Sequence, residues 1–253
     1  EPADRYATAG EVVDRLEEIG APAGVAPDPQ IYQTWREQGG DETSQLGRLK
    51  ADWDDVRLER SGKVIAIEGP RGAGTSLLLD RFVEGLDLER ATLLRLPSRA
   101  EDPAPLASLR RAARDVSEAT LRQAGLLEEL SALTGATEAS HETAMHGARA
   151  ADRWSQWLVT LARETGGVVL SVADLDAVDE PTAAVLEALV SQVPSVPIMV
   201  VGTTHRPDRV QERMPSVHRR TRSEHHARTV ELTPLNEEET ARLIQSYLGG
   251  DIA

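Results

Sequence analysis

Over most of the chain, short apolar runs alternate with longer stretches in which apolar residues recur at helical spacing. The apolar runs lie at residues 64–67, 91–96, 168–172, 198–202 and 229–232. Strand-length apolar runs between helical patterns are typical of a parallel sheet buried on both faces. The helical patterns lie at 76–85, 104–131, 142–165, 182–193 and 236–248. Together they predict an α/β fold: a five-stranded parallel sheet between two layers of helices.

The first 57 residues have a different pattern. Residues 1–20 have apolar positions at helical spacing, and Gly20 with Pro22 gives a stop signal. The chain is then rich in proline, alanine and glycine, and afterwards polar and acidic, with Trp35 and Trp53 as large apolar side chains. We expect residues 21–57 to be an acidic linker with one or two short helices that dock on the α/β part of the chain.

The amino-acid composition excludes several classes of function. The 253 residues include no cysteine, which excludes disulfides, thiolate metal sites and a cysteine nucleophile. Lys+Arg number 28 against 42 Asp+Glu, and residues 1–57 hold 13 acidic and 6 basic residues, half of the net charge of −14. Such an acidic chain is a poor general binder of nucleic acid. No apolar run is long enough for a membrane span and residues 1–5 do not resemble a signal peptide, so we expect a cytoplasmic protein.

A glycine-rich turn comes after the first apolar run and opens the first helical pattern. Its eight residues are Gly69, Pro70, Arg71, Gly72, Ala73, Gly74, Thr75 and Ser76. They match the phosphate-binding P-loop spacing G-x-x-x-x-G-K-[S/T] except at the lysine, where Thr75 stands. In such a loop, backbone N–H groups and the helix N-terminus cradle phosphates, and the hydroxyl at Ser76 would bind Mg²⁺. The turn predicts a P-loop fold and leaves nucleotide binding open.

The missing lysine has no obvious substitute. The chain has only two lysines, Lys50 and Lys63. Lys63 precedes the first strand and would lie about 16 Å from the turn, at ~3.3 Å for each strand residue. Arg71 lies inside the turn and could reach a phosphate. Thr75 cannot place a positive charge on the β- and γ-phosphates, which is the lysine's role.

The segment after the third apolar run carries a more specific resemblance. Residues 173–182 read Ala-Asp-Leu-Asp-Ala-Val-Asp-Glu-Pro-Thr. This resembles the segment of STAND-type and related AAA+ ATPases in which Asp-Asp-Leu-x-x-x-Asp-Glu-Pro-Ser/Thr comes after a strand. The alignment places Ala173 where the family has its Mg²⁺-binding aspartate. A slip by one residue would make Asp174 the metal ligand instead, at the cost of the match at 179–182.

Two later segments resemble the same family. The fourth apolar run continues into Thr203 and Thr204, and it is similar to the family's sensor strand, where a polar residue faces the γ-phosphate. Residues 233–239 resemble the start of the family's helical lid. The resemblance covers about 58–253 and implies a P-loop ATPase-like domain at 58–232 and the beginning of a lid at 233–253.

The N-terminal pattern resembles another family. Residues 1–16, with Arg5 and Tyr6, are similar to the last helix of bacterial Ser/Thr protein kinases, although a chance amphipathic helix also fits. The resemblance implies that residues 1–20 end a kinase domain that lies upstream in the same polypeptide. No catalytic residue of a kinase is present in this chain.

Residues 205–228 form a basic segment with seven arginines, three acids and four of the six histidines. It could be a nucleic-acid patch, a surface for an anionic partner, or the place of an arginine finger, for which the AAA+ resemblance indicates Arg219, Arg220 or Arg222. The simplest interpretation is a solvated, partly disordered loop. No aromatic residue lies in it, which argues against stacking on single strands.

These observations favour a catalytically degenerate P-loop ATPase-like module. It would act as a regulatory or scaffold part of a larger bacterial signalling protein, through protein partners or self-association, with no cofactor and no turnover of ATP. One alternative is a functional ATP-binding switch that controls oligomerisation, with Arg71 and Asp174 in the missing roles and Mg²⁺ on Ser76 and Asp174. The other is nucleic-acid binding through 205–228.

Overall fold

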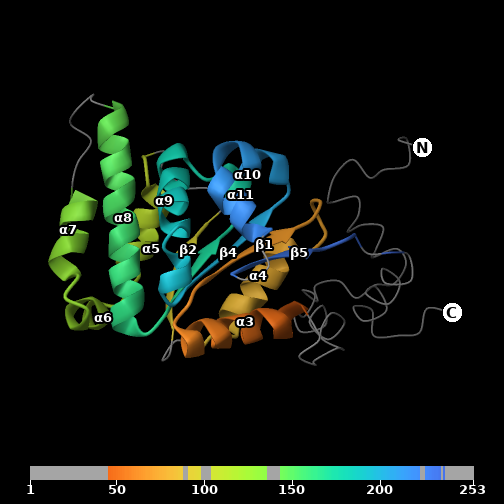
Figure 1. The fold of residues 1–253 in the computed structure, drawn as a ribbon, viewed down its shortest axis with the longest axis horizontal. Coiled ribbons are helices and arrows are strands. Elements are labelled where there is room, and N and C mark those ends of the chain that lie inside the picture. Colours follow the sequence, from red (N-terminus) through yellow and green to blue (C-terminus); the bar gives the residue numbers. More distant parts are fainter. Residues whose placement is uncertain are drawn as a thin grey trace, which may run out of the picture. The chain divides into compact units, whose positions relative to one another are not determined.

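The computed structural model describes residues 45–87, 91–97, 104–135, 143–222, 226–234 and 236. All of these except residue 236 belong to one compact unit, Asp41–Pro234. Strands and helices alternate along most of this unit (Figure 1). The strands are β1 (Lys63–Glu68), β2 (Thr92–Leu96), β3 (Val168–Val172), β4 (Ile198–Thr204) and β5 (Ala227–Glu231). The α-helices are α3 (Gln45–Glu59), α4 (Thr75–Glu84), α5 (Ala107–Arg114), α6 (Glu118–Gln123), α7 (Leu127–Gly135), α8 (Thr143–Thr165), α9 (Glu180–Val190), α10 (Pro207–Arg213) and α11 (Pro215–Thr221).

The five strands form one parallel sheet in the order β2-β3-β4-β1-β5. The register of the central pair places Ile65 opposite Val201 and Glu68 opposite Thr204, so β1 and β4 end side by side. The prediction of a five-stranded parallel sheet is confirmed. Each predicted apolar run is a strand, because a parallel sheet covered on both faces requires nearly continuous apolar residues.

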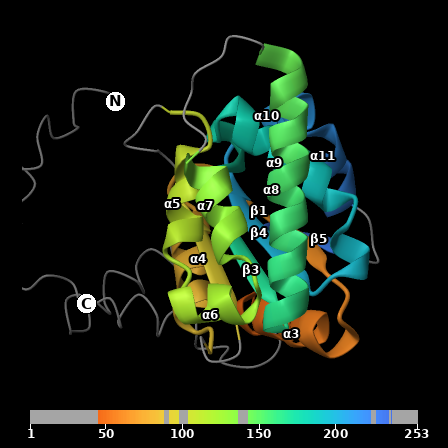
Figure 2. The same ribbon diagram turned by 90° about the vertical axis from the view of Figure 1, so that its left-hand side faces the viewer.

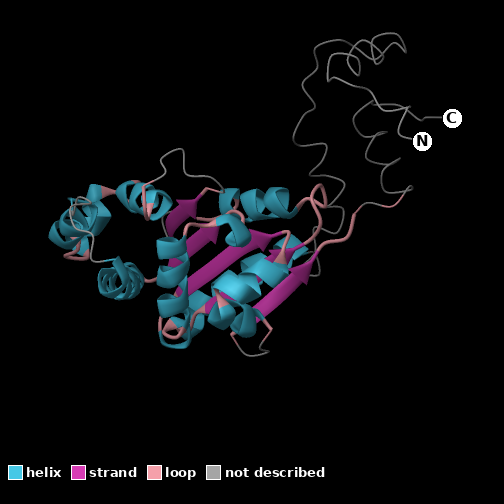
Figure 3. Ribbon diagram, turned by 90° about the horizontal axis from the view of Figure 1, so that it is seen from above, coloured by secondary structure: helices cyan, strands magenta, loops and turns pink. Residues whose placement is uncertain are grey.

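Helices cover both faces of the sheet, as Figure 3 shows. Alternate strand residues point to opposite faces. Ile65, Val169 and Met199 pack with α3 and α4 in one apolar cluster. Val64 and Val200 point the other way, into a larger cluster with residues of α5 to α11. On this second face, α6 and α7 lie beside the long helix α8 (Figure 2).

Helix α3 lies within the segment expected to be an acidic linker. Leu49, Trp53 and Val56 recur at helical spacing on it and are buried. A Cβ at Gly167 would lie only 2.8 Å from the Trp53 ring, so the indole packs on the backbone just before β3. The compact unit therefore begins before α3, and the acidic residues around Trp53 belong to a docked helix.

The helical pattern predicted over 104–131 corresponds to three helices, α5, α6 and α7, and not to one continuous helix. The side chain of Ser117 accepts a hydrogen bond from the backbone N–H of Thr120 at 3.1 Å and so begins α6. Gly125 has φ 68, a left-handed conformation that ends α6 before α7 begins. Local capping overrides the apolar spacing here.

The interpretation of 205–228 as a solvated loop is also wrong for most of its length. Two short helices, α10 and α11, occupy 207–213 and 215–221, and each begins with a proline at its first position. Val210, Met214 and Val217 anchor them in the core at 0–4% exposure. These three apolar residues recur at helical spacing, but the arginines around them made the segment resemble a solvated loop.

Several expectations lie outside the described residues: the kinase-like helix at 1–20, the linker up to 44 and nearly all of the lid at 233–253. Among the helices that the structure describes, none is long and apolar enough to cross a membrane.

Candidate functional site

The carboxyl ends of β1, β3 and β4 meet at one edge of the sheet. From there the chain leaves β1 into α4 on one face and leaves β4 into α10 on the other. In open α/β sheets, ligands bind at the carboxyl ends of two neighbouring strands whose connections leave toward opposite faces. The glycine-rich turn (residues 69–76) lies at this edge, next to the residues that directly succeed β3 and β4.

The turn has the backbone that its glycines predict. Gly72 and Gly74 have φ values of 87 and 90, in the left-handed region that side chains disfavour. The N–H of Ala73 donates to the carbonyl of Pro70 at 3.1 Å and closes the turn. Gly69 has no room for a side chain, because a Cβ there would lie 2.7 Å from the Leu232 carbonyl oxygen. The bend is therefore tight and leads directly into the N-terminus of α4.

The side chain at the lysine position points inward. Thr75 is 2% exposed, and a Cβ at Gly69 would lie 3.1 Å from its methyl group. Ser76 and Arg71 are both exposed. The side chain of Arg71 makes no hydrogen bond or ion pair with any residue that the structure describes.

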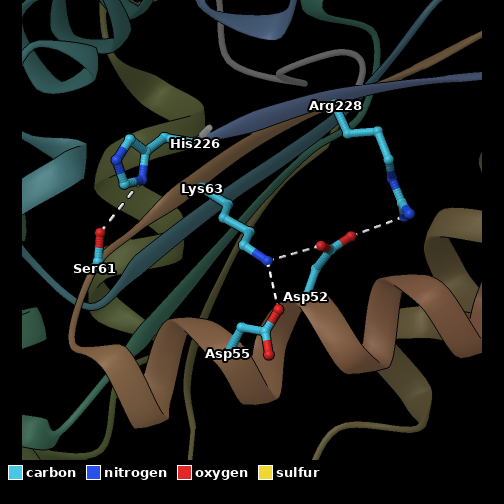
Figure 4. A network of polar contacts seen from close by, with 6 residues as sticks. All are labelled: Asp52, Asp55, Ser61, Lys63, His226 and Arg228. Carbon is cyan, nitrogen blue, oxygen red and sulfur yellow. Dashed lines mark hydrogen bonds and ion pairs between the residues drawn. The ribbon is translucent and has the colours of Figure 1, made fainter. Parts of the chain in front are cut away.

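Both lysines of the chain lie elsewhere. Lys63, at the start of β1, donates to Asp52 at 2.9 Å and to Asp55 at 2.7 Å, as Figure 4 shows. Burial by itself lowers the pKa of Lys63, but the hydrogen bonds and charges of Asp55 and Asp52 outweigh it, so the pKa is raised. Lys50 lies near Gly85, which directly follows α4. A Cβ at Gly85 would lie 3.3 Å from Nζ of Lys50.

The chain leaves the sheet one residue after the end of β3. The N–H of Ala173 still bonds the carbonyl of Leu96 on β2, at 2.9 Å. Asp174 then adopts φ 57, and its N–H donates to the hydroxyl of Thr203 at 3.0 Å. Asp179 caps α9 through the N–H of Thr182.

The carboxylate of Asp176 ties this exit to the end of β4. It accepts the hydroxyl of Thr204 at 2.8 Å and the N–H of His205 at 3.2 Å. Arg213 on α10 donates to the backbone carbonyls of Asp176 and Val178. Thr203 and Thr204 are at most 1% exposed, so both predicted sensor hydroxyls are buried and hydrogen-bonded to the segment after β3.

His205 connects this segment to the glycine-rich turn. Its Nδ1 lies 2.9 Å from the carbonyl oxygen of Gly69, and its Nε2 lies 3.5 Å from Oδ1 of Asp174. The structure thus brings together Gly69, Asp174 and the two threonines, as the sequence predicts, but it inserts an imidazole between the first two.

The arginines predicted as finger candidates differ in their contacts. Arg222, just after α11, pairs with Glu68 at 3.3 Å, and Glu68 is the last residue of β1 and 8% exposed. Arg219 donates to Ser216, one turn earlier on its own helix. Arg220 lies between them and is half-buried. Arg222 therefore supports the strand from which the turn begins.

Magnesium–ATP requires a cation on its phosphates and a carboxylate or hydroxyl on the metal. At this edge the lysine position holds a buried threonine, and the first residue after β3 is Ala173. Asp174 and Asp176, the nearest acids in the chain after β3, face His205 and Thr204. The expected lysine and metal-ligand positions are therefore occupied by Thr75 and Ala173, while the hydroxyl of Ser76 is exposed at the turn.

No model of a known protein family matches the sequence, and no curated protein sequence matches it. Among solved structures, the chain is similar to a Walker-type ATPase of Pyrococcus abyssi, with a TM-score of 0.53 and 12% identity over 84% of this chain and 60% of that one. The chain has a P-loop NTPase fold. It is also similar to the ORC2 protein of Aeropyrum pernix, with a TM-score of 0.47 and 14% identity over 83% of this chain and 51% of that one. It spans less than two thirds of the length of either protein.

The P-loop NTPase fold places two residues at the site that sequence reasoning did not single out. His205 belongs to the basic segment by its position, and the available signal was that it directly succeeds Thr203 and Thr204 at the end of a strand. Arg213 had no such signal, since only the fold shows that α10 lies against the exit of β3.

Proposed function

We propose that this chain is a P-loop-fold module that does not hydrolyse ATP and that acts through protein contacts within a larger bacterial signalling protein. The observation that carries the proposal is the side chain at the lysine position. Thr75 is buried at the start of α4, and both lysines lie away from the turn: Lys63 is paired at the amino end of β1, and Lys50 lies near the far end of α4.

The second half of the site supports the same conclusion. The residue directly after β3 is Ala173, and both sensor hydroxyls are hydrogen-bonded within the protein. Two charges are therefore absent from opposite sides of one site. A regulatory or scaffold role requires the fold but does not require ATP hydrolysis. The kinase-like pattern at 1–20 supports attachment to a Ser/Thr kinase domain.

Isothermal titration calorimetry with Mg-ATP, with a parallel assay of phosphate release, tests this proposal. The natural chain should show neither micromolar affinity nor turnover. The double variant Thr75→Lys/Ala173→Asp restores both charges and should gain at least about tenfold in Mg-ATP affinity, since each charged contact contributes on the order of 1.5–3 kcal/mol. Gln123→Lys adds only a lysine charge, on an exposed position of α6, and should change nothing. Micromolar, Mg²⁺-dependent affinity of the natural chain would refute the proposal.

A functional ATP-binding switch that controls oligomerisation is the second candidate. The left-handed glycines of the turn and the exposed Arg71 and Ser76 favour it. If it is correct, ATP shifts the molar mass measured by light scattering, and Arg71→Ala abolishes the shift. A molar mass that is independent of ATP contradicts it.

A further inference from the structure

The imidazole of His205 spans the two halves of the candidate site. Nδ1 contacts the carbonyl oxygen of Gly69 at 2.9 Å, and Nε2 faces the Asp174 carboxylate at 3.5 Å. The side chains of His205 and Asp174 are 18% and 28% exposed, so solvent screens the pair only in part. One side chain thereby links the first residue of the glycine-rich turn to the acid just beyond β3.

The atoms at both ends of this link are held in place. The N–H of His205 donates to Asp176, which also accepts the hydroxyl of Thr204. The N–H of Asp174 donates to Thr203, which is 0% exposed. On the other side, the N–H of Gly69 donates to the carbonyl of Thr204 at 3.3 Å. The ring is therefore set by the backbone at the ends of β1, β3 and β4.

The chemistry of the partners determines what the ring donates. A carbonyl oxygen only accepts, so Nδ1 carries a proton in the contact with Gly69. Nε2, on the opposite side of the ring, faces Oδ1 of Asp174 at 3.5 Å. The imidazole thus occupies the space between the carbonyl of Gly69 and the carboxylate of Asp174.

We infer that His205 is an internal lock on this site. It engages the carboxylate that could otherwise face a metal–phosphate ligand and at the same time fastens the start of the glycine-rich turn. The inference rests on the proposed function and deepens it, because it assigns part of the loss of nucleotide binding to one removable side chain.

Hydrogen exchange measured by mass spectrometry, together with calorimetry of Mg-ATP binding, tests the lock on the full chain. In His205→Ala, amides of residues 69–76 and 173–176 should exchange about ten times faster, and Mg-ATP affinity should rise about tenfold, because one polar contact to the Asp174 carboxylate is removed. The matched control is His218→Ala on α11, because the His218 side chain makes no polar contact within the described part of the chain. It should leave exchange and affinity unchanged.

Further variants separate the two contacts. His205→Asn retains an N–H that can donate to Gly69 but cannot reach Asp174, so it should raise the affinity while the turn keeps its slow exchange. In His205→Ala/Asp174→Asn the gain in affinity should disappear. If His205→Ala does not fold, His205→Asn alone decides, and an unchanged affinity overturns the lock.

The outcomes distinguish this inference from the proposed function. Micromolar affinity of the natural chain refutes the proposed function, whereas a further increase in His205→Ala still supports the lock. Unchanged exchange and affinity in His205→Ala overturn the lock, whatever the natural chain binds. A gain that persists when Asp174 is neutralised also overturns it, because Asp174 is then not the group that His205 engages.

Discussion

Asp52 and Asp55 of α3 form ion pairs with Lys63 and Arg228 of the sheet. This charge network allows a quantitative test of how the helix is held on the sheet. Asp52 accepts from Lys63 at 2.9 Å and lies 2.8 Å from Nη2 of Arg228, the latter an ion pair without a hydrogen bond (Figure 4). Its carboxylate is 16% exposed, and the two cations are 19% and 31% exposed. Asp52→Asn preserves the size of the side chain and removes its charge. Lys63 then retains only its ion pair with Asp55, which is 52% exposed, and Arg228 retains none with the residues that the structure describes.

The expected loss of stability lies between two limits. Removing one partner of a buried ion pair costs about 3–5 kcal/mol, and an exposed pair contributes about 0–1 kcal/mol. Since this network is mostly buried but not completely, we expect Asp52→Asn to lower the free energy of unfolding by about 2–3 kcal/mol. For a domain of this size the melting temperature should fall by about 5–10 °C.

Urea denaturation monitored by tryptophan fluorescence measures this effect, because Trp53 is buried on the same helix at 5% exposure. The matched control is Asp54→Asn, whose carboxylate is 66% exposed and 3.8 Å from Arg57. It should change the free energy of unfolding by less than about 0.5 kcal/mol. Equal effects of the two variants would refute the argument that α3 is fastened by this network.

Two further predictions concern the pH and the packing of the sheet. The pKa of Lys63 is raised in the folded state above its ordinary value of 10.5, so its contribution to stability is complete below pH 10.5 and is lost as the pH rises through the folded-state pKa. Lys63→Met should reduce this loss in alkaline urea titrations, and an unchanged pH profile would contradict it. Gly202→Ala should destabilise the domain by about 1–3 kcal/mol, because its Cβ would lie 2.6 Å from Cγ of Leu175. Gly135→Ala, whose Cβ would meet nothing within 4 Å, is the control for the denaturation experiment, and a similar loss in both variants would refute the packing argument.

The sheet could be predicted from the sequence because its three central strands are buried on both faces and are therefore nearly continuous apolar runs. Val168–Val172 is buried at every position, and so is Ile198–Thr204. The ends of the helices were harder to predict. Ser117 begins α6 and Gly125 ends it, although the amphipathic pattern continues through both residues. Local capping of this kind changes the boundaries without changing the hydrophobic spacing.

The candidate site could be predicted only in part for a different reason. The glycine-rich turn, Asp174 and the two threonines could be identified because each lies at or just beyond the end of a strand, and parallel strands end at one edge. The contact of His205 with Gly69 joins residues 136 positions apart and depends on the register of β1 with β4. The pairing of Arg222 with Glu68 spans 154 positions and depends on where α11 ends. Spacing along the sequence carries no information about either contact.

Cationic side chains form ion pairs and hydrogen bonds at both edges of the sheet. At the amino ends of the strands, Lys63 and Arg228 neutralise Asp52, and the acidic helix α3 is docked there. At the carboxyl ends, Arg222 pairs with Glu68 and Arg213 binds the carbonyls after β3. Arginine and histidine therefore serve the edge at which a P-loop ATPase requires lysine. Preference for arginine over lysine does not explain this, because the position itself holds Thr75, which is buried against Gly69. A side chain that packs in the turn stabilises the turn, whereas a lysine at that position stabilises a bound phosphate, and this difference is the reason for the non-hydrolytic role that we propose.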